Sequence, residues 1–202
     1  VAATAGAITA ADIQPLQARM AVIGSSLRGE VGLDVLQALH AKGIPVAADM
    51  QGFVRLLQDQ TLIYAPWPEM REHLAEIDIL KSDAVEAEAL TGETDIYQAA
   101  RIYASMGPKE IVLTHKDGVL FYANGEFSEV GFYPAQMNGR SGRGDTCLGS
   151  YAAMRLSKPP FEAGIWAAAV TSLKMEKLGV FDRSVADVEA LIQAKYAQRT
   201  AR

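Results

Sequence analysis

The chain alternates short apolar runs with amphipathic stretches, and this alternation limits the possible fold more than any other feature of the sequence. Apolar runs of strand length occur at residues 20–24, 44–49, 77–80 and 110–115. Between the first two runs, Val35, Leu36 and Leu39 fall on one helical face, which Gly43 closes. Strands that alternate with helices build layered α/β folds, so the sequence predicts a largely parallel sheet covered by helices.

Two glycine turns predict a different arrangement at one edge of this sheet. Asp117-Gly118 and Asn124-Gly125 are hairpin signals, so the runs around them should pair as antiparallel neighbours. From residue 144 onward the pattern is nearly all helical, whereas residues 51–70 read as irregular, broken by Pro66 and Pro68. The expected fold is a three-layer α/β/α sandwich with a mostly parallel, Rossmann-like sheet and an antiparallel edge. Ligands of such sheets bind at the carboxyl ends of the strands.

Composition and charge exclude several classes of function. The 202 residues suit one domain, and the net charge is −5 with 19 basic residues spread along the chain, so nucleic acid is not expected as a partner. No apolar run reaches the roughly 18 residues that a membrane span needs. A single cysteine, Cys147, permits no disulfide within the chain and fits a reducing compartment, which makes a cytoplasmic location the expectation.

The glycine-rich turn at residues 139–145, GRSGRGD, is the strongest candidate site. Gly142, Arg143 and Gly144 could form an anion hole, because backbone N–H groups that open a helix attract phosphate. Asp145 at its rim could take a proton from a substrate hydroxyl as a general base. Two other interpretations stay open. Asp145 could be a helix N-cap, or residues 143–145 could be an Arg-Gly-Asp adhesion tripeptide.

Two carboxylates open the predicted helix at residue 84. Glu86 follows Asp83 by three residues, so both point toward the start of this helix. They could organise a hydrated Mg²⁺, which prefers oxygen ligands. The structural alternative is a capping box, with Asp83 as the N-cap and Glu86 at the third helical position.

The hairpin after residue 114 is the third candidate. Thr114 ends a predicted strand and could bond a nucleotide phosphate, while Gly118 could let a ligand approach the backbone. A plain hairpin explains the same residues, because an Asp-Gly pair is sufficient for the turn.

Taken in order, the three motifs resemble the ribokinase-like (PfkB-type) carbohydrate kinases. That family carries Asn-x-x-Glu, then a Thr-ended strand with a glycine turn, then a glycine-rich loop that ends in Asp at a helix start. The resemblance implies an ATP-dependent kinase that uses Mg²⁺ and transfers the γ-phosphoryl group to a hydroxyl of a sugar or polyol. It assigns Asp145 as the base, the anion hole to Gly142, Arg143 and Gly144, the metal to Glu86, and the nucleotide site to Thr114, Gly118, Asp83 and Ala168.

The chain departs from the family pattern at four positions. Asp83 stands for Asn, Gly139 for the Asp linked to a monovalent-cation site, Ala168 for an Asn near the adenine, and Arg143 for a small residue. Arg143 could screen phosphoryl charge or fold away into solvent. Family members are longer, so residues 1–202 are expected to form one ribokinase-like domain without the N-terminal part and the lid. The alternative function is a catalytically reduced member or fragment that binds nucleotide; a homodimer is compatible with either.

Overall fold

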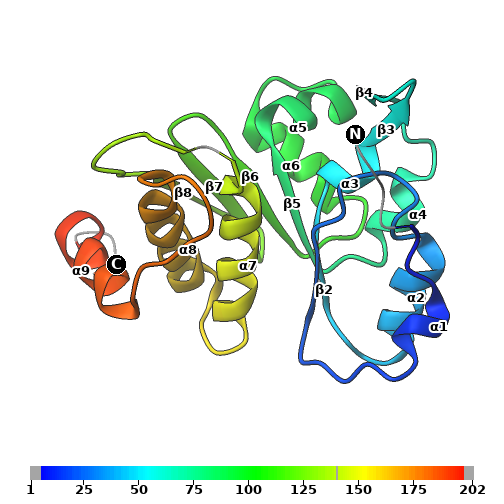
Figure 1. Cartoon of the computed structure of the whole chain (residues 1–202), viewed down its shortest axis with the longest axis horizontal. Coiled ribbons are helices and arrows are strands. Elements are labelled where there is room, and N and C mark those ends of the chain that lie inside the picture. The colour runs from blue at the N-terminus through cyan, green and yellow to red at the C-terminus, as the bar shows by residue number, and fades with distance from the viewer. Residues whose placement is uncertain (1–5, 140, 198–202) are drawn as a thin grey trace.

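A six-stranded mixed sheet forms the centre of the computed structural model, which describes residues 6–139 and 141–197 (Figure 1). In spatial order, its strands are β1 (Ala21–Ile23), β2 (Val46–Asp49), β5 (Ile79–Asp83), β6 (Glu110–Thr114), β7 (Gly118–Ala123) and β8 (Glu126–Gly131). The first four strands run parallel. β7 pairs antiparallel with β6 through the first glycine turn and with β8 through the second. This arrangement confirms the predicted mostly parallel sheet and its antiparallel edge.

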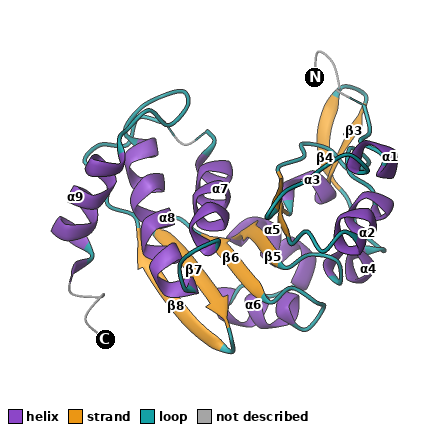
Figure 2. Cartoon of the chain, turned by 90° about the horizontal axis from the view of Figure 1, so that it is seen from below, coloured by secondary structure: helices purple, strands orange, loops and turns teal. Residues whose placement is uncertain are grey.

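Helices cover both faces of the sheet, which confirms the layered α/β/α fold. The helices are α1 (Ala10–Ile13), α2 (Leu33–Ala41), α3 (Gln51–Val54), α4 (Met70–Leu74), α5 (Ala84–Thr91), α6 (Ile96–Ala104), α7 (Arg143–Arg155), α8 (Pro160–Met175) and α9 (Val185–Lys195). Figure 2 shows α7 and α8 on one side of the sheet and α6 on the other. None of the helices in the described part of the chain is long and apolar enough to cross a membrane.

Alternate residues of the central strands divide between two hydrophobic cores. Ile111 and Leu113 of β6 belong to the core that also contains residues of α2, α5 and α6, whereas Val112 between them belongs to the core that contains residues of α7 and α8. Successive side chains of a strand point to opposite faces, so a strand that is buried on both faces needs an unbroken apolar run. This requirement explains why these strands read as continuous hydrophobic segments.

The segment at residues 51–70 is more regular than its sequence predicts. It contains α3 and a separate two-stranded antiparallel ribbon of β3 (Arg55–Gln58) and β4 (Thr61–Tyr64), visible in Figure 2. Asp59 and Gln60 form the turn with φ of 48° and 64°. Such hairpin turns usually carry Gly or Asn at these positions, so the sequence gives no turn signal here. The expectation of an irregular segment is therefore wrong for these strands.

The carboxyl ends of three parallel strands meet the first turn of α7. β2 ends at Asp49, β5 at Asp83 and β6 at Thr114, and α7 begins at Arg143. Parallel pairing in register brings the strand ends together, although they are far apart in the sequence. The sheet thus places polar side chains from distant segments around the start of one helix.

Candidate functional site

A polar cavity of about 300 Å³ lies where the strand ends meet α7. Its lining residues are Asp49, Gln51, Lys81, Asp83, Thr114, Ser141, Gly142, Arg143, Gly144 and Asp145. Six of the nine residues predicted from the sequence line it: Asp83, Thr114, Gly142, Arg143, Gly144 and Asp145. The three separate motifs therefore converge on one cavity.

The backbone at the start of α7 has the geometry that the predicted anion hole requires. Gly142 is the N-cap residue, and its φ of 75° lies in the left-handed region that favours glycine. The first helical hydrogen bond runs from Thr146 N to Gly142 O, at 3.0 Å. The N–H groups of Arg143, Gly144 and Asp145 therefore have no intrahelical acceptor, and they carry the partial positive charge of the helix start.

Asp145 is the third residue of α7 and not its N-cap, so the capping interpretation of this aspartate is wrong. No side chain caps the helix, because Gly142 occupies the N-cap position. The Asp145 side chain is exposed at the cavity, and within the described ranges its carboxylate accepts no hydrogen bond. A Cβ placed on Gly24, just after β1, would lie 3.7 Å from its Oδ1. The carboxylate is therefore available to an incoming hydroxyl.

A buried ion pair, which the sequence motifs did not reveal, forms the floor of the cavity. Lys81 Nζ lies 2.9 Å from Asp49 Oδ2, and the two residues are 4% and 3% exposed. They are register partners on β5 and β2, so the pairing of the strands brings them together. Burial lowers the pKa of Lys81, but the Asp49, Glu86 and Asp83 carboxylates outweigh burial and raise it. Lys81 therefore stays protonated and supplies a fixed charge.

The floor and the anion hole are in close contact at Gly144. A Cβ on this residue would lie 2.6 Å from Lys81 Nζ and 3.2 Å from Asp49 Oδ2. Real Cβ atoms essentially never come within 3.0 Å of other heavy atoms, so any other residue here would have to displace the end of the Lys81 side chain, whereas glycine lets the first turn of α7 rest on the ion pair. This close approach accounts for the glycine of the Arg-Gly-Asp sequence, whereas the adhesion alternative stays untested.

Arg143 spans the cavity from α7 to the turn after β6. Its Nη1 donates to His115 O at 3.3 Å, and its side chain is half-buried at the cavity wall. Of the two alternatives for this arginine, the geometry favours the one that keeps its charge at the cavity. A guanidinium in this place can bond phosphate oxygens.

Asp83 and Glu86 form the capping box that the sequence offered as the structural alternative. Glu86 N donates to Asp83 Oδ1 at 2.8 Å, and Asp83 N donates to Glu86 Oε2 at 3.0 Å. Burial raises the pKa of Glu86 to about 7, although nearby Lys81 lowers it. A capping role does not exclude a role toward a metal, so the metal assignment stays a prediction.

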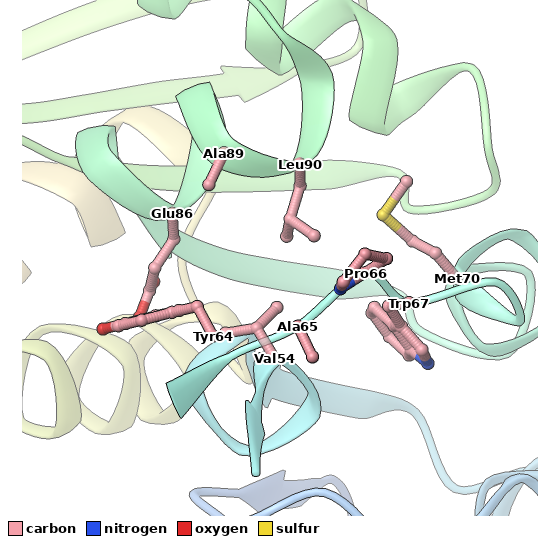
Figure 3. Close-up of a pocket in the computed structure, with 9 residues that line it drawn as sticks. All are labelled: Val54, Tyr64, Ala65, Pro66, Trp67, Met70, Glu86, Ala89 and Leu90. Atoms are coloured by element: carbon pink, nitrogen blue, oxygen red, sulfur yellow. The ribbon is translucent and has the colours of Figure 1, made fainter. Parts of the chain in front are cut away.

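Glu86 lines a second pocket and not the polar cavity. This neighbouring pocket of about 340 Å³ is mainly apolar, with Glu86 and Tyr64 at one end and Trp67 and Met70 at the other (Figure 3). In the described part of the chain, no group of three or more His, Cys, Asp or Glu could hold a metal ion. Magnesium often uses only one or two carboxylates together with substrate phosphates, and Asp83 at the cavity fits that mode.

Of the residues Thr114, Gly118 and Ala168, which were predicted to bind the nucleotide, only Thr114 lines the polar cavity. Thr114 lines the polar cavity, although it is 1% exposed. Gly118 is buried beneath β8, where a Cβ would lie 2.5 Å from Val130 O. Ala168 is fully buried within α8. Neither of these two residues lines the cavity, so their contact with a nucleotide stays a prediction.

The comparisons with known proteins come from solved structures, since no family model and no curated protein matches the chain. A variant of a pyrophosphate-dependent myo-inositol-1 kinase superposes with a TM-score of 0.87 and 34% identity, over 96% of this chain and 70% of that one. A pyrophosphate-dependent kinase in the ribokinase family, complexed with a pyrophosphate analog and myo-inositol, superposes with a TM-score of 0.86 and 34% identity, over 94% of this chain and 69% of that one. Arabidopsis thaliana ribokinase, complexed with ribose and ATP, superposes with a TM-score of 0.67 and 27% identity, over 83% of this chain and 55% of that one. The chain therefore belongs to the ribokinase family of kinases that act on sugars and sugar alcohols.

Proposed function

We propose that the chain transfers a phosphoryl group to a hydroxyl of a polyol, with Asp145 as the general base. The carrying observation is the unpaired, exposed carboxylate of Asp145 beside the free N–H groups that open α7. In this reaction Asp145 takes the hydroxyl proton while the hydroxyl oxygen bonds to phosphorus. The bond from phosphorus to the leaving phosphate oxygen breaks, and that oxygen keeps the electron pair.

The charges around the cavity support this chemistry. The N–H groups of Gly144 and its neighbours, together with the side chains of Lys81 and Arg143, provide positive potential toward the phosphoryl oxygens. Bound Mg²⁺ would neutralise donor charge, and Asp83 would hold it together with the donor phosphates. Lys81 is buried in an ion pair and Arg143 is hydrogen-bonded to His115 O, so both side chains need little reorganisation during transfer.

Pyrophosphate is the donor that we favour over the ATP expected from the sequence resemblance. Two solved relatives at 34% identity are described as pyrophosphate-dependent. The cavity lining is almost entirely polar or charged, which suits a compact anion, and it offers no aromatic or aliphatic face for an adenine. Gly118 and Ala168, expected beside a nucleotide, are buried away from it. ATP remains the second candidate, since a relative at 27% identity is complexed with ATP.

The test is transfer from each donor to a panel of acceptors, followed by ³¹P NMR. Magnesium pyrophosphate and MgATP are each supplied with myo-inositol, ribose and further polyols. The proposal expects a phosphate ester with pyrophosphate and myo-inositol or a related cyclic polyol. Formation of ester from ATP alone would reverse the donor assignment. Absence of ester from both donors would leave the alternative of a binding protein without turnover.

Asp145→Asn tests the base separately from donor binding. Loss of a general base costs about 10²- to 10⁴-fold in kcat. The affinity for pyrophosphate should stay or increase, because a negative charge beside the anion is removed. Asp59→Asn in the β3–β4 turn is the matched control, since asparagine tolerates a positive φ. Near-normal turnover by the Asp145 variant would refute its assignment as the base.

A further inference from the structure

Lys174 is a buried lysine that the mechanism above does not use. It lies in the last turn of α8 and is only 4% exposed. Lysine is almost never buried to this degree unless its ammonium is paired, because desolvation of the charge is costly. The carbonyl groups at a helix C-terminus offset part of this cost.

No carboxylate in the described ranges forms an ion pair with Lys174, although Asp145 lies nearby: a Cβ on Gly142 would be 3.5 Å from Lys174 Cε and 4.0 Å from Asp145 Oδ2. Its Nζ has one long hydrogen bond, to Lys177 O at 3.5 Å, and no ion pair. Glu176, two residues further on, bonds instead to Ala135 N and to Arg183. Lys174 Nζ therefore has no direct counter-charge among the described residues.

The buried lysine packs directly behind the anion hole. A Cβ on Gly142, the N-cap of α7, would lie 3.5 Å from Lys174 Cε. The loop that leads into the anion hole is fixed to the same helix end, because Asn138 N and Gly139 N both donate to Met175 O at 2.9 Å. Gly142 lines the polar cavity and Lys174 does not, so the lysine lies behind this part of the cavity wall.

We propose that Lys174 is a positioning residue whose fixed charge strengthens phosphate binding in the anion hole; this inference rests on the proposed function. A cation beside a helix N-terminus is unfavourable, because both carry positive charge. Binding of an anion at the helix start removes this repulsion. In a buried, low-dielectric setting, the resulting gain is larger than at the surface. The free protein therefore keeps an electrostatic cost that the bound donor and the transferring phosphoryl group relieve.

Lys174→Met tests this role, because it removes the charge and keeps an unbranched side chain of similar length. We expect the Kd for pyrophosphate to rise about tenfold and kcat to fall about 10- to 100-fold, with an unchanged KM for the acceptor. The melting temperature should stay or rise, since an uncompensated buried charge is gone. Lys177→Met is the control, because its side chain is exposed and pairs with Asp182.

Lys174→Ala adds a test of the charge itself. It leaves a space that ammonium ions can enter and tetramethylammonium ions cannot, so ammonium chloride should restore part of the pyrophosphate affinity and turnover. The wild-type protein should respond equally to both salts.

Pyrophosphate affinity is measured by calorimetry and does not depend on finding the acceptor. If the wild-type protein binds pyrophosphate but transfers no phosphoryl group, the proposed function fails while the affinity comparison still decides on Lys174. Affinity and kcat of Lys174→Met within twofold of wild type would overturn the inference. So would a loss of affinity that accompanies a lower melting temperature, which would indicate a purely structural role.

Discussion

Gly144→Ala gives the sharpest test of how the site is built. The new Cβ would lie 2.6 Å from Lys81 Nζ and 3.0 Å from Lys81 Cε, so the end of the lysine side chain must shift and its contact with Asp49 is disturbed. Both partners of the ion pair are buried, and removal of one partner from such a pair costs about 3–5 kcal/mol, which is an upper limit for displacing it. Alanine in place of glycine returns about 1 kcal/mol through helix propensity. The free energy of unfolding should therefore fall, by at most about 4 kcal/mol.

Gly149→Ala in the same helix is the matched control. Nothing lies within 4 Å of a Cβ at this position outside the helix backbone itself. The substitution should therefore show the propensity gain alone and stabilise the protein by about 0.5–1 kcal/mol. Both variants are compared by urea unfolding at one pH, with the slope of the transition checked for constancy.

A variant without the ion pair shows whether the ion pair causes the difference in stability between Gly144→Ala and Gly149→Ala. In the double variant Asp49→Ala, Lys81→Ala, the groups that a Cβ on Gly144 would strike are absent, so Gly144→Ala should no longer destabilise. The reasoning is refuted if Gly144→Ala and Gly149→Ala have the same stability in the wild-type background. It is also refuted if the loss at Gly144 persists in the double variant.

Three further predictions concern groups next to the site and in the core. Burial raises the pKa of Glu86 from 4.5 to about 7. The folded state therefore binds the Glu86 proton more tightly than the unfolded state. The stabilisation from this proton is complete below pH 4.5 and is lost as pH rises through about 7. In urea unfolding measured across that pH range, Glu86→Gln should remove the fall in the free energy of unfolding, which amounts to at most about 3 kcal/mol in the wild-type protein. Asp83→Ala should cost about 1 kcal/mol by loss of the cap, whereas Asp83→Asn should cost little by the same assay. Leu120→Ala should cost about 2–5 kcal/mol in thermal unfolding because Leu120 is fully buried, and Leu57→Ala on the exposed ribbon should be near neutral.

The sequence predicted most of the sheet because its signals are local. Buried parallel strands read as continuous apolar runs, and the two glycine turns identified the antiparallel edge. The β3–β4 ribbon was missed, because Asp59 and Gln60 adopt positive φ without the glycine that would mark the turn. The predicted strand at residues 77–80 lies two residues further on, at Ile79–Asp83, since strand pairing extends through the polar end that periodicity cannot detect.

The site was predicted where its residues are consecutive and missed where the fold assembles them. Residues 142–145 are consecutive at the start of α7, so their spacing was readable from the sequence alone. Asp49 and Lys81 meet only through the register of β2 and β5, and Lys174, in the last turn of α8, lies next to Gly142 behind the cavity. The N-cap position was assigned wrongly to Asp145, because the left-handed backbone of Gly142 starts the helix earlier than a capping side chain would.

The assembly of the cavity from distant strands also bears on how the protein folds. Its walls come from the ends of β2, β5 and β6 and from α7, so it exists only after the parallel strands have paired across long stretches of sequence. Such non-local pairing is the slow part of folding an α/β protein. An anion that binds the finished cavity therefore binds the native state alone. At a concentration of 100 times its Kd, it would add about 2.7 kcal/mol to the free energy of unfolding. The phosphoryl donor is in this sense also a folding ligand, and its cellular concentration would help to set how much of the chain is folded.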